Sequence, residues 1–534
     1  MTEPTTDTFS HLVIGAGPAG LQLALHLQEA GRHYTVLEAG DAPGTFFATF
    51  PRHRTLISSN KVHTGTDDPE LNLRMDWNSL LGPDPDLLFT RYSERYFPAA
   101  DDLRRYLADY AARLDLRVRY GTRVVRVERP EPGGPFLVRT AGGDRLRAEA
   151  VIVATGVGTP YVPPVPGIEH AEQYATMPVD PAGFTDQRVL ILGKGNSAFE
   201  TADNLIEKAA VIHVAGPHSI RLAWQSHYVG HLRAVNNNFL DTYQLKSQNA
   251  ILDGSVLEIT PRPGDGGFLV RFSFARADEV VKELHYDRVL CCTGFRMDAT
   301  PFADECRPAL TINDRFAALT SAYESVNVPG LYFAGTLMQQ RDFKRATSGF
   351  IHGFRYTVRA LSRILDQRGH GAQWPHRALP HHAESLADAV LGRVNRSSAL
   401  WQQFGVLADV ILLPDHGEAR YLEEVPLGYA VEGRLADPGN GLPVDAQSLM
   451  LAVTLEYGPD HDKVDPFDIT VRRTAQNDAE RAHDAAYLHP VIRAYRNGEM
   501  IAEHHLAENL ENQWDGELTH RAPLVAFLAK AAAL

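Results

Sequence analysis

Two short apolar runs in this chain each end in a glycine-rich turn that leads into a helical pattern. The first run, His11-Leu12-Val13-Ile14, precedes Gly15-Ala16-Gly17-Pro18-Ala19-Gly20. The second run, Arg188-Val189-Leu190-Ile191-Leu192, precedes Gly193-Lys194-Gly195-Asn196-Ser197-Ala198. Short apolar runs bounded by glycine are typical of strands that are buried on both faces. At each place we therefore expect a buried strand, a tight turn and the start of a helix.

The remaining pattern predicts more elements of the same alternating kind. Further buried strands are expected at Tyr34–Leu37, Val151–Val153, Val211–Ala215 and Arg288–Leu290. A return segment, Val328–Gly335, leads into a long helical pattern from about Ser348 to Leu365. The last part opens with helical patterns, passes the strand-like run Leu449–Leu455 and closes on an apolar helix over Ala522–Leu534.

This alternation favours an α/β fold with two Rossmann-like dinucleotide-binding domains and a C-terminal α+β domain. Residues 1–165 and 300–368 are expected to form the first dinucleotide-binding domain, 166–299 the second, and 369–534 the C-terminal domain. Four prolines between Pro160 and Gly167 make that crossing poor helix or strand material, so it is a candidate hinge.

The first glycine motif predicts an FAD site. Gly15 makes the tight turn, Gly17 lets the backbone approach a pyrophosphate, and Gly20 allows close packing of the helix on the strand. Glu38 lies 18 residues beyond Gly20, where an acid accepts hydrogen bonds from an adenosine ribose. The residues expected to bind FAD are Gly15, Gly17, Pro18, Ala19, Gly20, Glu38, Phe46, Phe47, Asn60, Thr155, Gly156 and Gly335.

The second motif predicts a nicotinamide coenzyme, with NADPH favoured over NADH. No acid occurs from Ala209 through Leu240, and Arg221 and His218 lie just beyond the expected strand end, which suits a 2′-phosphate. The alternative is that Arg221 is a solvated loop residue. The residues expected to bind NADPH are Gly193, Gly195, Asn196, Ser197, Ala198, Arg221, Thr293 and Gly294.

Composition and charge narrow the class of protein. The chain has 534 residues, 44% of them hydrophobic, and a formal net charge of −14, which argues against nucleic acid or an anionic membrane as the main partner. No secretory signal or membrane-length apolar run is present, so we expect a cytoplasmic protein. The three cysteines include no Cys-x-x-Cys pair, so the thiol relay of a thioredoxin-type reductase is missing. A homodimer is left open.

Several longer strings carry a family resemblance. They are Phe50-Pro51-Arg52-His53, Leu73-Arg74-Met75-Asp76-Trp77-Asn78-Ser79-Leu80-Leu81, Asp241-Thr242-Tyr243-Gln244-Leu245-Lys246-Ser247, Gly349-Phe350-Ile351-His352-Gly353-Phe354-Arg355-Tyr356, Leu488-His489-Pro490-Val491 and His504-His505-Leu506. With these strings the chain resembles the flavin-containing monooxygenase-like group of two-dinucleotide-binding flavoproteins. Within that group it resembles the ER flavoprotein associated with degradation and its bacterial relatives, which include single-component flavin-dependent halogenases.

Two departures from the group's pattern bear on function. The Phe-x-Gly-x-x-x-His fingerprint of the monooxygenases is not kept, because Ala171 stands at the histidine position and His170 comes one residue early. The usual Gly-Asp near the end of the FAD domain is Gly335-Thr336 here. Oxygenation is therefore implied by the group and not by its signature.

The resemblance implies three candidate catalytic residues: Asn60, Lys246 and Glu200. An asparagine at the place of Asn60 sits beside the flavin in the family, where an amide donor would stabilise developing negative charge. The related halogenases use a lysine with a nearby glutamate, which makes Lys246 and Glu200 candidates for handling hypohalous acid. The alternatives are a loop-capping Asn60, a helix-surface Glu200 and a Lys246 that contacts the NADPH phosphate. No metal site is expected, although His227 and His231 have i, i+4 spacing.

Together these features predict an FAD-dependent, NADPH-consuming single-component oxidoreductase. The resemblance implies a monooxygenase that forms a C4a-(hydro)peroxyflavin with O2 and transfers oxygen to a small organic substrate. One alternative is a halogenase of an aromatic substrate, which would need halide as well. A second is an NADPH–flavin reductase that serves a partner protein.

Overall fold

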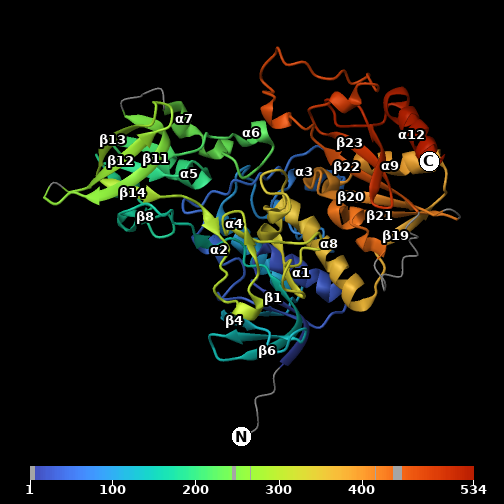
Figure 1. The fold of residues 1–534 in the computed structure, drawn as a ribbon, viewed down its shortest axis with the longest axis horizontal. Helices are drawn as coiled ribbons and strands as arrows, with labels where there is room; N and C mark the ends of the chain where they lie inside the picture. Colours follow the sequence, from blue (N-terminus) through green and yellow to red (C-terminus); the bar gives the residue numbers. More distant parts are fainter. Residues whose placement is uncertain (1–6, 243–247, 265, 415–416, 437–447, 534) are drawn as a thin grey trace, which may run out of the picture.

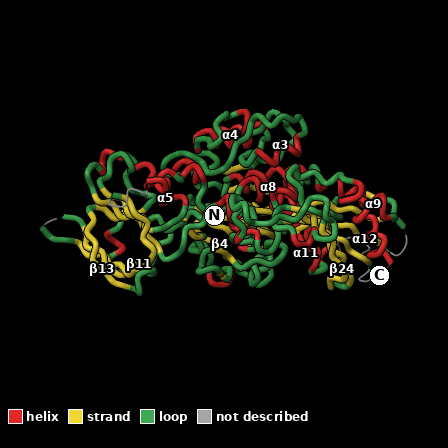
Figure 2. The backbone as a smooth tube through the Cα atoms, turned by 90° about the horizontal axis from the view of Figure 1, so that it is seen from above, coloured by secondary structure: helices red, strands yellow, loops and turns green. Residues whose placement is uncertain are grey.

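The computed structural model of the chain describes residues 7–242, 248–264, 266–414, 417–436 and 448–533. Within them, three sheets lie side by side along the longest axis of the molecule, and Figures 1 and 2 show the corresponding three parts. We call these the central unit, the inserted unit and the C-terminal unit. No helix in the described ranges has both the length and the apolar character needed to span a membrane.

The central unit is built on a sheet with the strand order β3-β2-β1-β6-β5-β4, with β18 paired to β6. Its strands are β1 (Asp7–Ile14), β2 (Tyr34–Leu37), β3 (Val118–Arg119), β4 (Val124–Glu128), β5 (Phe136–Thr140), β6 (Arg145–Val153) and β18 (Leu331–Phe333). Its helices are α1 (Pro18–Glu29), α2 (Phe46–Thr49), α3 (Pro69–Met75), α4 (Ala100–Arg113) and α8 (Ile351–His370). The C-terminal halves of the parallel strands β1 and β6, together with β2 and β18, are mostly apolar and buried, and this core explains the continuous hydrophobic runs of the sequence.

The inserted unit follows β6 in sequence and returns the chain to the central unit before β18. Its sheet has the order β13-β12-β11-β10-β9-β14-β8. The strands are β8 (Glu172–Gln173), β9 (Arg188–Leu192), β10 (Val211–Gly216), β11 (Asn249–Pro261), β12 (Phe268–Phe274), β13 (Val280–Tyr286) and β14 (Arg288–Cys291), and the helices are α5 (Asn196–Leu205), α6 (Ala223–Ser226) and α7 (Asn238–Thr242). The outgoing and returning chains pair as β7 (Thr159–Pro160) and β15 (Phe295–Arg296), so two antiparallel segments join the units.

The C-terminal unit is an antiparallel sheet with helices packed against it. The strand order is β19-β21-β20-β22-β23-β24. The strands are β19 (His376–Leu379), β20 (Leu407–Leu413), β21 (Ala419–Pro426), β22 (Leu449–Glu456), β23 (His489–Arg496) and β24 (Glu499–His505), and the helices are α9 (Ala383–Val394), α10 (Ser398–Gln402), α11 (Leu427–Val431) and α12 (Ala522–Ala533). The helical opening expected from the sequence corresponds to α9 and α10, whereas the short edge strand β19 before them was not expected. The four residues of β19 are mostly exposed and show no apolar periodicity.

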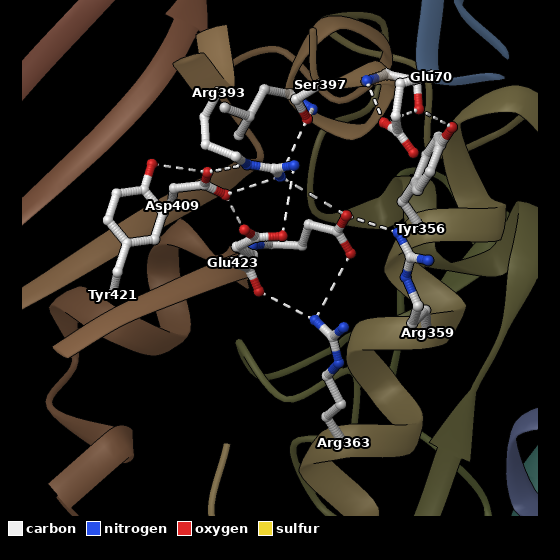
Figure 3. Close-up of polar contacts among 12 residues, drawn as sticks. Glu70, Tyr356, Arg359, Arg363, Arg393, Ser397, Asp409, Tyr421 and Glu423 are labelled. Carbon is white, nitrogen blue, oxygen red and sulfur yellow. Dashed lines mark hydrogen bonds and ion pairs between the residues drawn. The ribbon is translucent and has the colours of Figure 1, made fainter. Parts of the chain in front are cut away.

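Helix α8 joins the C-terminal unit to the central one through a buried ionic network, shown in Figure 3. Arg359 donates to Glu424 at 2.6 Å, and Arg363 lies 3.6 Å from the same carboxylate. Arg393 of α9 donates to Asp409 at 2.7 Å, and Asp409 also accepts from Tyr421 Oη at 3.0 Å. Burial alone would raise the pKa of Glu424, but the three arginines together hold it below its usual value.

Candidate functional site

The first glycine motif forms a tight turn that would accept a pyrophosphate. Gly15 has a φ of +104°, which L side chains rarely adopt, and a Cβ on Gly20 would lie 1.9 Å from Gly15 O. A Cβ on Gly17 would meet no protein atom within 4 Å, because this position faces a cavity. Gly15 and Gly20 are therefore needed by the turn itself, while Gly17 leaves room for a ligand at the start of α1. Gly335 is a packing position as well, since its Cβ would lie 2.4 Å from Ala19 Cβ.

Glu38 ends β2 beside this turn, in the position expected for a ribose contact. Its carboxylate accepts hydrogen bonds from Ala16 N at 2.7 Å, Gly40 N at 2.9 Å and Thr45 Oγ1 at 2.8 Å. A carboxylate offers about four lone-pair sites, so these bonds leave acceptor capacity for a ribose hydroxyl. The three bonds fix the orientation of the carboxylate before any ligand binds.

Two adjoining cavities run from this turn along the central unit. One, of about 430 Å³, is lined by Glu38, Thr45, Thr122 and Arg123 among others, and the other, of about 470 Å³, is lined largely by apolar and aromatic side chains. The lining residues that the two cavities share are Gly17, Phe46, Ala154, Thr155 and Gly156. The first would hold an adenosine and the second a flavin ring, with the pyrophosphate between them at Gly17. We call the second space the flavin cavity. The residues of both cavities fit FAD.

The second glycine motif borders a larger cavity of about 1010 Å³, the coenzyme cavity. Gly193 has a φ of +115°, and a Cβ on Gly195 would again meet nothing within 4 Å. Arg221, Arg315 and Lys344 all line the space. Burial, Arg315 and Arg221 lower the pKa of Lys344. Three basic side chains near a helix N-terminus suit a phosphorylated ligand.

Asn196 and Ser197, at the start of α5, and Thr293 and Gly294 also line the coenzyme cavity. The Asn196 side chain is already used by the protein: it donates to His231 O at 2.8 Å and accepts from Arg233 N at 3.0 Å. It thus fixes the segment 228–236 against the coenzyme cavity. Ala198, in the first turn of α5, is buried and does not line the space.

The segment fixed by Asn196 separates the flavin cavity from the coenzyme cavity. Tyr228 and Gly230 line both spaces. The Tyr228 hydroxyl donates to Gln339 Oε1 at 3.1 Å, and its ring packs edge-on against Phe350. A ligand in either cavity would therefore contact the same side chain, which is where a nicotinamide and a flavin would meet.

His352, in the first turn of α8, is the residue of the flavin cavity that sequence reasoning did not single out. Its ring stacks on Trp77 at 4.3 Å between centroids. Both ring nitrogens are buried and lack a hydrogen-bond partner among the described residues. Burial, Arg355 and Arg233 hold the pKa of His352 well below its usual value, so the imidazole is neutral. A neutral imidazole carries one donor and one acceptor, and no described residue uses either of them. The signal in the sequence was its place in the string Gly349–Tyr356.

Of the predicted catalytic residues that the structure describes, neither Asn60 nor Glu200 lines the flavin cavity. Asn60 is buried, and its amide donates to Ser93 O at 2.6 Å and Arg95 O at 3.3 Å instead of lining the cavity. Asn78, from the Leu73–Leu81 string, is the asparagine that lines it. The role of Asn60 stays a prediction.

Glu200 lies on α5 and accepts a hydrogen bond from the Tyr174 hydroxyl, which in turn accepts from Arg52 N at 3.0 Å. It is therefore not a helix-surface residue but part of a contact between the inserted and central units. Burial raises the pKa of Glu200 to about 7. Lys246 lies outside the described residues.

The cysteines and histidines add no further redox or metal centre in the described ranges. Cys291, Cys292 and Cys306 are free and buried. Burial raises the pKa of Cys306 to about 11 and that of Cys291 above its usual value, so these thiols are poor nucleophiles. No group of three metal-ligating side chains comes together there.

Comparisons with known proteins agree with this geometry. The model of the pyridine nucleotide-disulphide oxidoreductase family matches residues 12–335. FAD-dependent oxidoreductase domain-containing protein 2 of Mus musculus is 38% identical over 565 residues, covering 97% of this chain and 83% of its own. The Danio rerio protein of the same name is 36% identical, covering 98% and 83%. A flavin-containing monooxygenase from Stenotrophomonas maltophilia has a similar fold, with a TM-score of 0.52 at 22% identity, covering 68% of this chain and all of its own.

Proposed function

The chain belongs to the pyridine nucleotide-disulphide oxidoreductase family and is an FAD-dependent oxidoreductase, and from that premise we propose that it is an NADPH-dependent, single-component monooxygenase. The observation that carries the proposal is the wall that the flavin and coenzyme cavities share at Tyr228 and Gly230. Hydride transfer needs the donor and acceptor atoms at about 3–3.5 Å, so the Tyr228 side chain would move aside when a nicotinamide reaches the flavin. One chain provides both spaces next to each other, so no second reductase component is required.

FAD, when bound, supplies hydride acceptance and the reaction with dioxygen. The chain's own residues would position it. Gly17 leaves room for the pyrophosphate, Glu38 accepts from the ribose, and the aromatic walls at Phe46 and Phe47 border the ring space. His352 and Asn78 provide polar atoms beside that space, where they would hold a polar edge of the ring or a substrate.

The walls of the flavin cavity favour oxygen transfer over electron transfer to a protein thiol. Trp77, Phe350 and Phe354 give the space a mainly apolar lining, which excludes water from a reactive oxygen species. The buried cysteines in the described ranges offer no dithiol to carry electrons away. The balanced reaction consumes NADPH, O2, a proton and a small organic substrate such as an amine, sulfide or ring carbon. It yields NADP⁺, water and the oxygenated substrate.

The proposed reaction assigns a coenzyme contact to Arg221 and a proton-donor role to Lys246. Arg221 would contact the 2′-phosphate of NADPH with Arg315 and Lys344 nearby. Lys246 would act as a proton donor after flavin reduction, with Glu200 as a second acid–base group of the same unit. Lys246→Ala should then leave flavin reduction by NADPH intact and lower product formation by roughly 10²–10⁴-fold, with more hydrogen peroxide released. Slower reduction at unchanged coupling would make Lys246 a phosphate contact instead.

The decisive experiment mixes the FAD-loaded protein with NADPH or NADH without oxygen, and then with O2, while the flavin spectrum is followed. We expect faster reduction by NADPH. With O2 we expect a transient spectrum distinct from those of oxidised and reduced flavin, and a lifetime that depends on substrate. Direct return to the oxidised spectrum, together with fast reduction of an added protein acceptor without oxygen, would contradict a monooxygenase and identify a reductase. Turnover that requires bromide or chloride would identify a halogenase.

A further inference from the structure

A third cavity, of about 530 Å³, lies at the seam between the central and C-terminal units. Ser321, Tyr323, Arg341, Asp342, Arg345 and Ala346 line one side of it, and the C-terminal unit provides the rest, with Phe404, Val406, Leu427, Tyr457 and Tyr495 as its larger apolar and aromatic side chains. None of these residues lines the flavin or coenzyme cavity. We call this space the seam cavity.

Asp342 is one of two carboxylates that line the seam cavity, and the other, Glu456, is paired with Arg493. Asp342 is 4% exposed. Oδ2 accepts a hydrogen bond from Ser348 N at 3.1 Å, whereas Oδ1 is buried and has no partner among the described residues. A buried carboxylate oxygen without a donor is costly, so the cavity lacks a donor that a ligand can provide. Burial raises the pKa of Asp342 to about 6, which leaves it mainly ionised at neutral pH.

Two arginines lie at the exposed side of the same cavity. Arg341 donates to Leu319 O at 3.2 Å and Arg345 to Arg341 O at 3.4 Å. Neither guanidinium has a carboxylate within 4 Å in the part of the chain that the structure describes. Gly428 leaves space for the first of them, since a Cβ there would lie 3.3 Å from Arg341 Nη2. The two guanidiniums thus retain donors for an anion.

We propose that the seam cavity is a binding site for a small zwitterion of the amino-acid type. An ammonium group would donate to Asp342 Oδ1, and a carboxylate would accept from Arg341 and Arg345. An apolar side chain would lie against Phe404, Tyr457 and Tyr495. The lining carries a negative charge at Asp342 and positive charges at Arg341 and Arg345. A ligand with only one charge would leave the other part of the lining without a partner, so the cavity favours a ligand that carries both.

The position of this cavity links its ligand to the coenzyme. The segment Gln339–Ala346 lines all three spaces: Gln339 the flavin cavity, Phe343 and Lys344 the coenzyme cavity, and Asp342 the seam cavity. On the opposite wall, Tyr457 stacks on His227 of the inserted unit at 4.1 Å between centroids. A zwitterion in the seam cavity would therefore contact the segment Gln339–Ala346, which also lines the coenzyme cavity, and Tyr457, which stacks on His227 of the inserted unit.

The test is calorimetric titration of the FAD-loaded full chain with L-phenylalanine, phenylacetate and phenethylamine. We expect saturable binding of L-phenylalanine, and affinities at least tenfold weaker for the two compounds that lack one charge. Asp342→Asn should weaken L-phenylalanine binding about tenfold or more, and Arg341→Gln with Arg345→Gln should do the same from the other end of the ligand. Arg147→Gln, an exposed arginine of the central unit, is the matched control and should change nothing.

Three outcomes would overturn the proposal. They are no saturable binding of L-phenylalanine at millimolar concentrations, equal binding of phenylacetate or phenethylamine, and unchanged binding by the arginine double variant. The two arginines are exposed, so their variants fold even if Asp342→Asn does not. Because the readout is binding and not turnover, the result is independent of whether the chain is a monooxygenase.

Discussion

Helix α8 contributes to two buried regions that differ in whether their polar side chains have partners. Near its middle, Arg359 and Arg363 face Glu424 across the seam with the C-terminal unit, and Figure 3 shows the carboxylates and arginines of this network converging on one another. At its first turn, His352 is equally buried, but neither ring nitrogen has a hydrogen-bond partner among the described residues. In the first region each charge faces an opposite charge, although Arg359 Nε and Glu424 Oε2 make no hydrogen bond to the described residues. The ring of His352 has no such partner among them, which makes it a candidate ligand contact.

The largest loss of stability is expected in the buried ionic network between α8 and the C-terminal unit. Asp409 is fully buried and accepts from Arg393, Tyr421 and Glu424 N. Asp409→Asn leaves Arg393 with a buried charge that is only partly compensated, so the free energy of unfolding should fall by about 3–5 kcal/mol in urea titrations. Arg396→Gln breaks a surface pair with Asp68 and should lower the free energy of unfolding far less. Equal losses in the two variants would remove the contrast between buried and exposed pairs.

Glu200 is an intermediate case, because Tyr174 is its one side-chain hydrogen-bond partner among the described residues. Its pKa is about 7 in the folded chain and 4.5 when solvated, so the folded state binds the proton more tightly. Stability should therefore fall as pH rises from about 4.5 to 7. Glu200→Gln should flatten this slope and be more stable than the parent at pH 8 by roughly 1–3 kcal/mol. Thermal or urea unfolding across pH measures it. Glu169→Gln, an exposed control, should retain the parent's slope.

Substitutions at two glycines distinguish a loss of fold stability from a loss of FAD binding. Gly17→Ala meets no protein atom within 4 Å, so unfolding should be nearly unchanged while the dissociation constant for FAD rises roughly 10–100-fold. Gly20→Ala places a Cβ 1.9 Å from Gly15 O and should impair both folding and FAD binding. Flavin fluorescence titration and urea unfolding distinguish them. Full FAD affinity in Gly17→Ala would place the pyrophosphate elsewhere.

A pair of buried histidines tests the comparison directly. His352→Leu removes a polar ring that lacks partners, so the FAD-free protein should be as stable as the parent or more stable by ~1 kcal/mol, while turnover falls. His489 is bonded to Tyr487 O at 2.7 Å and His505 Nδ1 at 2.9 Å. His489→Leu should therefore destabilise by ~1–3 kcal/mol without changing flavin reduction. If His352→Leu behaved like His489→Leu, the ring would be structural.

The smallest effect is expected at an exposed contact. Arg221 is 62% exposed and lies 3.4 Å from Asp462. Arg221→Ala should raise KM for NADPH by up to about tenfold and leave KM for NADH nearly unchanged. Asp462→Asn removes the competing carboxylate, so it should lower KM for NADPH slightly. An enzyme that prefers NADH before any substitution would refute the role of Arg221.

The sequence allowed prediction of those parts whose cause is local. The two glycine turns, Glu38 and the strands β1, β2, β9 and β10 each follow from a few neighbouring residues, and the α/β fold is confirmed by the related structures. Asp342, His352 and the Arg393–Asp409 pair were not predictable, because their significance depends on missing or distant partners. Asn60 and Asn78 show the same limit. Asn60 was chosen from the family resemblance, whereas Asn78 lies in the string Leu73–Leu81, and only the folded chain shows that Asn78 lines the cavity.

The pairing of β18 with β6 also has a consequence for synthesis of the chain. The central unit needs Leu331–Phe333 beside Val151–Val153 and Gly335 against Ala19, yet about 180 residues separate β6 from β18. The ribosome delivers the inserted unit in between, and domains generally fold as units while the chain emerges. All strands of the inserted unit's sheet are therefore synthesised before β18, the last strand of the central unit's sheet. The N-terminal half of the FAD cradle must stay open, with apolar strand edges exposed, until residue 335 has left the exit tunnel.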